Sequence, residues 1–250
     1  MPPVGGWQNP GRVLLNWSDD PIRDLEMVAE KYQALAHDRV VALRSRRGGV
    51  RMSDDFEAYP IVFLYRQAFE LLLKAIVFAG AVAIREEGEE PMPLKSAMRH
   101  ELTPLFKEVC RVFKAFGAGK DDPWDVGIHG LRTYRDFESV VREFDEIDSG
   151  SYTFRYSIQK DGATPSLDRG FEFDLFAFAD IMDKILPALS GGPEWIRESL
   201  QDRWQAAYEA QQEAWANADF DPPEYDPPDY DPGDFDCDPP EYEPAEYYGD

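Results

Sequence analysis

The chain has 250 residues, which is long enough to bury a substantial hydrophobic core, and its formal net charge is −23. A charge this negative argues against broad, non-specific attraction to the phosphates of DNA or RNA. The charge is uneven, because the 13 acidic residues from Asp219 onward are accompanied by no Lys or Arg. The remaining 36 acidic and 26 basic residues give the body a net charge of −10, which leaves room for a local basic patch.

Cysteine usage and the N-terminal sequence are typical of a protein from a reducing compartment. Cys110 lies in a helical pattern and Cys237 in the acidic tail, so neither a disulfide framework nor a metal-ligand spacing follows from them. We therefore expect no metal and no cofactor. The first residues, MPPVGGWQNP, lack a basic region followed by an apolar run, so no secretion signal is predicted and a cytoplasmic location is expected.

The first predicted elements are an arm and a helix. Residues 1–17 are rich in Gly, Pro and Trp without a regular period, and we expect them to lie on the body as an N-terminal arm. A helix is predicted to begin at Pro21, because a proline suits the first helical position and the preceding residues 18–20 offer capping side chains. Apolar residues recur at helical spacing until Gly48-Gly49 ends the pattern.

The longest apolar-rich stretch, residues 56–87, is predicted to be the central helix of the fold. Its apolar residues extend around almost the full circumference, as expected for a helix that other helices surround. Gly80 and the following EEGEEP segment are expected to end it. No membrane span is predicted, because Arg66, Glu70 and Lys74 would then lie in lipid.

Further helices are predicted before the tail. The first are a helix from Thr103 to Phe116, a loop over 120–127 and a helix over 130–148. An extended segment over 149–158 with a turn at Asp161-Gly162 follows. The last are a helix from Phe171 to Leu189, capped by Asp174 or an earlier residue, and a helix within 193–218. The last helix is mostly polar, so it either packs on the body or projects from it. The predicted fold is all-α, with a helical bundle over 18–192 and one short extended or hairpin segment.

The segment 219–250 is an internal repeat of five residues that combines acids, proline and an aromatic residue. Its like charges repel and it has too few apolar residues to bury a core, so we expect a tail that is disordered on its own. It is a candidate contact for a partner through its aromatic residues, which are Tyr225, Tyr230, Phe235, Tyr242 and Tyr247. A mimic of nucleic acid and a merely solubilising tail are the alternatives.

Arg66, Glu70 and Lys74 follow one another at four-residue steps and therefore share one face of the central helix. Because that helix is expected to be buried, the charges need partners. Charges from a neighbouring helix and from a later segment, such as Arg155, are the candidates. A buried structural network is the first interpretation, and a binding site is the second. His100 precedes a predicted helix, where a hydrogen-bonding role is common and catalysis is the alternative.

Three motifs follow one another within residues 54–189. They are RQAFELLLKA at 66–75, HEL at 100–102 and FRYS at 154–157. In this order they resemble the HEPN-like helical domain family (higher eukaryotes and prokaryotes nucleotide-binding). The resemblance implies a helical bundle that is frequently dimeric. It also implies either a metal-independent ribonuclease, often from a toxin–antitoxin or phage-defence system, or an inactive, RNA-binding or scaffold member.

The ribonuclease motif of that family is missing from this sequence. Active members carry an Arg, four to six residues and then a His on a late helix, where the His acts as general acid or base and the Arg holds the phosphate. No Arg stands at that spacing before His37, His100 or His129. We therefore expect a non-catalytic interaction module that forms a homodimer or binds a protein partner. The alternative is a divergent ribonuclease or nucleotide-handling enzyme, although the net charge does not indicate an RNA or nucleotide ligand.

Overall fold

The computed structural model describes residues 19–46, 55–118, 123–128, 131–148 and 150–217. The chain divides into two units, Met1–Gln205 and Ala206–Asp250. The predicted N-terminal arm (1–17) and the predicted acidic tail (219–250) lie outside the described residues.

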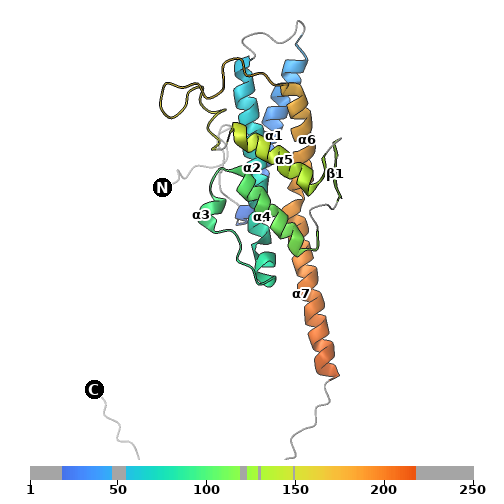
Figure 1. Ribbon diagram of the computed structural model, residues 1–250. Coiled ribbons are helices and arrows are strands. Elements are labelled where there is room, and N and C mark those ends of the chain that lie inside the picture. The colour runs from blue at the N-terminus through green and yellow to red at the C-terminus, as the bar shows by residue number, and fades with distance from the viewer. Residues whose placement is uncertain (1–18, 47–54, 119–122, 129–130, 149, 218–250) are drawn as a thin grey trace, which may run out of the picture. The chain divides into compact units, whose positions relative to one another are not determined.

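Helices dominate the described residues, which confirms the predicted all-α class (Figure 1). One two-stranded antiparallel hairpin, β1–β2, interrupts them. In chain order the elements are α1 (Pro21–Arg44), α2 (Asp55–Glu86), α3 (Leu94–Ala97), α4 (Leu102–Ala115), β1 (Pro123–Ile128), β2 (Leu131–Thr133), α5 (Tyr134–Ile147), α6 (Leu175–Ser190) and α7 (Gly192–Ala216).

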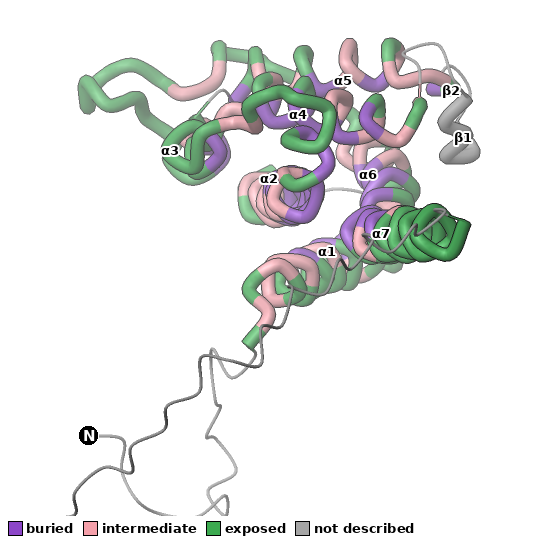
Figure 2. The backbone as a smooth tube through the Cα atoms, turned by 90° about the horizontal axis from the view of Figure 1, so that it is seen from below, coloured by how far each residue is buried: buried purple, intermediate pink, exposed green. Residues whose placement is uncertain are grey.

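The helix α2 is central to the bundle, because α1, α4 and α6 all pack against it (Figure 2). It is apolar on almost every side, as predicted, and most of its residues between Ile61 and Ile84 are buried. A helix covered from several directions needs apolar side chains all round, because a buried polar group without a partner destabilises the fold. The charged residues buried within α2 are therefore the exception that needs an explanation.

The same helix is long and apolar enough to cross a membrane, and it is the one such helix among the described residues. However, 72% of its most apolar window is buried inside the bundle. The core helix of a soluble protein meets the same criterion, so this is weak evidence for a membrane span.

Gly80 does not end α2, contrary to the prediction, because the helix continues to Glu86. Gly80 lies instead where α2 meets α4, and a Cβ atom built on it would be 2.2 Å from Cγ1 of Val112. The glycine therefore permits a close approach of two helices. The turn that follows α2 contains Gly88, whose φ of 76° suits glycine.

A residue from another helix caps the N-terminus of α4. The helix begins at Leu102, and Glu101 in the N-cap position makes no side-chain capping bond. The amides of Leu102 and Thr103 donate instead to the carboxylate of Asp145 in α5, at 3.0 and 3.1 Å. This carboxylate satisfies donors that a helix N-terminus leaves open and complements the helix dipole.

Two predicted boundaries are corrected around the hairpin. The segment predicted as a loop over 120–127 contains β1, and the helix predicted over 130–148 is preceded by β2. The helix α5 begins only at Tyr134, because Thr133 and Asp136 form a capping box that fixes its first turn.

The segment predicted to be extended over 149–158 is a series of turns in its described residues. Two successive amides donate to the carbonyl of Tyr152 at 3.1 Å, as in a helical turn. The carboxylate of Asp148 binds other amides of this segment, and such local side-chain bonds compete with strand formation. The predicted turn at Asp161-Gly162 is present and is flanked by a single β-bridge.

The helix predicted to begin at Phe171 begins only at Leu175, whereas α7 follows its predicted bounds closely. Asp174 caps α6 as predicted, by accepting two amide hydrogens of the first turn. Gly191 alone separates α6 from α7. The start of α7 packs on the body through the buried side chains of Ile196 and Leu200, whereas residues 205–217 are exposed.

Candidate functional site

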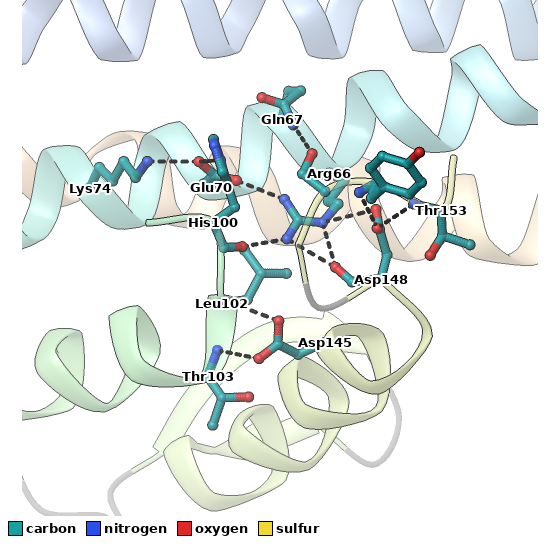
Figure 3. Close-up of polar contacts among 12 residues, drawn as sticks. Arg66, Gln67, Glu70, Lys74, His100, Leu102, Thr103, Asp145, Asp148 and Thr153 are labelled. Atoms are coloured by element: carbon teal, nitrogen blue, oxygen red, sulfur yellow. Dashed lines mark hydrogen bonds and ion pairs between the residues drawn. The ribbon is translucent and has the colours of Figure 1, made fainter. Parts of the chain in front are cut away.

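A buried polar network surrounds Arg66 on the central helix (Figure 3). The side chains of Arg66 and Glu70 are 0% and 2% exposed, and that of Lys74 is 6% exposed. All three lie on one side of α2, as their four-residue spacing predicts. The charges therefore form a group within the core.

Glu70 connects the two cations of α2. Its Oε2 atom accepts a hydrogen bond from Nη1 of Arg66 at 2.7 Å, and its Oε1 atom accepts one from Nζ of Lys74 at 2.7 Å. Nδ1 of His100 lies 2.9 Å from the same Oε1 atom. Both oxygens of this buried carboxylate are therefore occupied by protein groups.

The guanidinium of Arg66 reaches two segments outside α2. Its Nε atom lies 3.2 Å from Oδ2 of Asp148 in an ion pair. Nε and Nη2 also donate to the main-chain carbonyl of Asp148 at 3.3 and 3.1 Å, and Nη2 donates to the main-chain carbonyl of His100. Arginine suits this position, because its planar guanidinium carries five donors in a fixed arrangement.

Asp148 completes the network just after α5. Its Oδ1 atom accepts from the amides of Tyr152 and Thr153 at 2.6 and 2.8 Å. The turn that leads from Asp148 to Tyr152 contains Ser151. Its φ of 54° lies in the left-handed region, which is unfavourable for serine. The hydroxyl of Ser151 accepts from Nε2 of Gln67 at 2.5 Å, so α2 also helps to hold this turn.

The charges within the network balance, because the cations Arg66 and Lys74 face the carboxylates Glu70 and Asp148. Burial by itself raises the pKa of Glu70, but the hydrogen bonds and charges of Lys74 and Arg66 outweigh burial and hold that pKa below its ordinary value. Removing one member would leave a buried charge uncompensated. The group therefore has the properties of an architectural ion-pair network.

His100 is the accessible member. Its side chain is 51% exposed, although Nδ1 faces the buried carboxylate of Glu70. A carboxylate that orients a histidine leaves the other ring nitrogen, Nε2, free to exchange a proton with a bound molecule. This pair is the part of the network most compatible with chemistry.

The structure does not bring Arg155 into the network. Its side chain is exposed, and its guanidinium carbon lies 5.9 Å and 5.3 Å from the ring centroids of Phe63 and Tyr156. The partner that sequence reasoning missed is Asp148. The acidic segment EFDEID, which ends at Asp148, indicated that carboxylates were available nearby. However, 82 residues separate Asp148 from Arg66, and no local sequence pattern links the two residues.

The other histidines and the aromatic residues of the tail are not part of the network around Arg66 in the described residues. His37 pairs with Asp183 of α6, with Nδ1 2.6 Å from Oδ2. His129 and the aromatic residues of the tail, Tyr225, Tyr230, Phe235, Tyr242 and Tyr247, lie outside the described residues. Within the described residues, no group of His, Cys, Asp and Glu has the arrangement needed to hold a metal ion.

Two cavities lie away from the network. One has a volume of about 560 Å³ and is lined by basic and apolar side chains of α4 together with the start of α5. The other has a volume of about 890 Å³ and lies where the start of α2 meets the segment that precedes α6. Neither cavity is lined by Arg66, Glu70, Lys74 or His100.

No protein-family model matches this chain, and neither a curated protein nor a solved structure is significantly similar to it. The resemblance to the HEPN-like family therefore stays a prediction, based on the motifs given above.

Proposed function

We propose that the chain is a non-catalytic interaction module of the HEPN-like type, which forms a homodimer or binds a protein partner within a bacterial toxin–antitoxin or defence system. The observation that carries this proposal is the burial of Arg66, Glu70 and Lys74 within one ion-pair network. The charges that would serve an active site are buried and are paired with one another.

An active site for phosphate chemistry needs a cation that can reach the substrate. The side chain of Arg66 is fully buried, and its bonds run to protein acceptors at Glu70, His100 and Asp148. Lys74 is almost fully buried against the same carboxylate of Glu70. Neither cation can contact a phosphate without first losing an ion pair, which would leave a buried charge uncompensated.

The sequence supports the same proposal in two further ways. The spacing of Arg and His that active HEPN-like ribonucleases use is missing from it. The repeats within 219–250 provide an acidic, aromatic segment that is suited to contacts with another protein.

The test combines an activity assay with a measurement of mass. The purified full chain should leave both single-stranded and structured RNA uncleaved. Its mass in sedimentation equilibrium should rise above the monomer mass of 28.6 kDa as the concentration increases. Turnover of RNA that disappears in His100→Ala would overturn the proposal.

A divergent ribonuclease is the second candidate, and the exposed His100 that Glu70 orients is the observation that favours it. In that case, His100→Ala should lower the cleavage rate about 10²–10⁴-fold, the range for losing a general acid or base. His37→Ala is a matched control, because His37 is also 51% exposed and is also paired with a carboxylate. Equal residual cleavage in the two variants would identify a contaminating nuclease.

A further inference from the structure

The helix α4 presents a line of basic residues beside a cavity. Lys107, Arg111 and Lys114 stand at positions i, i+4 and i+7, and all three line the cavity of about 560 Å³. This volume is typical of ligand-binding pockets. The wall between the charges includes the side chains of Cys110 and Tyr134. The cavity therefore combines positive charge with an apolar wall.

The positive charge available to a ligand comes from the two lysines. Arg111 is already paired, with Nη2 2.8 Å from Glu89 and Nη1 2.6 Å from Glu108. Lys107 and Lys114 are exposed, and neither is within ion-pair distance of a carboxylate among the described residues, although the charge of Lys114 also acts on Glu89. Seven residues of helix place these two lysines roughly 10 Å apart along the axis and on the same face.

The repeats of the tail have a matching pattern. Each of the five repeats, which start at residues 221, 226, 231, 238 and 243, has an acid at its first and fourth positions and an aromatic residue at its fifth. In the extended polyproline conformation that proline favours, three residues make one turn and rise about 3.1 Å each. The two carboxylates of a repeat would then share one face, roughly 9 Å apart, with an aromatic ring beside the second.

The other cavity does not suit such a ligand. Its wall is aromatic, but it also contains the carboxylates of Asp55, Glu172 and Asp174. Carboxylates facing carboxylates repel each other, so an acidic segment is disfavoured there. Among the described residues that line the cavity on α4, Glu138 is the one acidic residue.

We propose that the cavity on α4 is the docking site for an acidic repeat of the tail of a second copy of this chain. One repeat places its two carboxylates against Lys107 and Lys114, and its ring against the wall formed by Cys110 and Tyr134. Each tail has five repeats, whereas each body offers this cavity once. The repeats of a single tail can therefore bind to more than one copy of the chain. Repetition of this kind raises the strength of association without any new type of contact. The inference rests on the proposed function, because it identifies the contact through which the module associates.

Zero-length crosslinking of the full chain tests the contact. A carbodiimide joins a lysine to a carboxylate that it touches, and an equal mixture of ¹⁴N- and ¹⁵N-labelled protein distinguishes links between copies from links within one chain. Links between copies should join residues 219–250 to Lys107 and Lys114 several-fold more often than to Lys31 and Lys95, which are also exposed. Links spread evenly over the four lysines, or found only within one chain, would overturn the proposal.

Charge reversal provides the second test. The variant Lys107→Glu/Lys114→Glu should weaken self-association in sedimentation equilibrium about tenfold, because two exposed lysine–carboxylate contacts are reversed. The control Lys31→Glu/Lys95→Glu changes the net charge by the same amount elsewhere and should associate like the wild type. If the two double variants associate equally, the proposed contact between the tail and the cavity on α4 is wrong, but the proposed interaction module is not contradicted. Turnover of RNA that depends on His100, in contrast, would contradict the proposed non-catalytic function, whatever the crosslinks show.

Discussion

At the scale of single residues, the folded state depends on how the guanidinium of Arg66 is satisfied. It is buried in the central helix α2, whose other buried residues are mostly apolar, and an unpaired ion there would be strongly destabilising. The ion pairs to Glu70 and Asp148 and the bonds to two main-chain carbonyls remove that penalty. The same bonds join α2 to the segment before α4 and to the end of α5. Arg66 therefore acts as a structural connection between three parts of the chain.

Replacing Arg66 by alanine should lower the free energy of unfolding by about 3–5 kcal/mol, the usual range for removing one partner of a buried ion pair. Urea unfolding of the full chain measures this change. Arg85→Ala is the control, because Arg85 lies on the same helix but is exposed, and its loss should cost less than about 0.5 kcal/mol. Equal, small effects of the two substitutions would mean that the network contributes little to stability.

The sequence allowed most members of this network to be named. Arg66, Glu70 and Lys74 could be grouped because a four-residue spacing on a helix is a local signal. Asp148 could not be assigned, since its carboxylate reaches Arg66 only through the tertiary fold. The candidate partner Arg155 illustrates the same limit: it is near Asp148 in sequence, but its side chain lies over aromatic rings instead.

At the scale of elements, local capping signals located the starts of α1 and α6. Asp20 and Asp174 start α1 and α6 with their own side chains, and both were among the residues predicted to cap these helices. The start of α4 depends on Asp145, which is 43 residues away from Leu102. The hairpin was missed because a strand of three residues, β2, is too short to show an alternating pattern.

The contact of α2 with α4 depends on the absence of a side chain at Gly80. Gly80→Ala should destabilise the fold by about 1–3 kcal/mol, as overpacking usually does, even though alanine favours helix formation. Val112→Ala removes the methyl groups that the new Cβ would meet, so the double variant should lose less stability than the sum of the two single variants. Thermal unfolding of all four proteins measures this coupling, and additive losses would contradict the close contact.

At the scale of the whole molecule, charge acts in opposite ways inside and outside the core. The net charge of −23 produces repulsion that weakens as carboxylates are protonated at low pH. The network inside the core behaves in the opposite way, because its carboxylates must be ionised to balance Arg66 and Lys74. The stability of the chain in acid therefore depends on the competition between these two effects.

The variant Glu70→Gln separates the contribution of the buried network to the unfolding free energy from that of the net charge of the whole chain. The pKa of Glu70 is lowered in the folded state, so its contribution to stability is complete above its ordinary value of 4.5 and is lost as the pH falls through the folded-state pKa. The difference in unfolding free energy between the wild type and Glu70→Gln should therefore be constant at neutral pH and should narrow below about pH 4.5. Urea unfolding at a series of pH values measures it, and a difference that grows in acid would show that the pKa of Glu70 is raised instead.

The position of Asp148 also has a consequence for the order in which the chain is assembled. During synthesis α2 leaves the ribosome before α5, and the 82 residues that separate Arg66 from Asp148 follow over roughly 4–16 s at ordinary elongation rates. Throughout that interval the nascent chain holds two cations, Arg66 and Lys74, against the single carboxylate of Glu70. Until α5 emerges, the middle of α2 has a net positive charge and favours contact with water over burial. The emergence of the end of α5 is thus the event that balances the buried charges of the central helix.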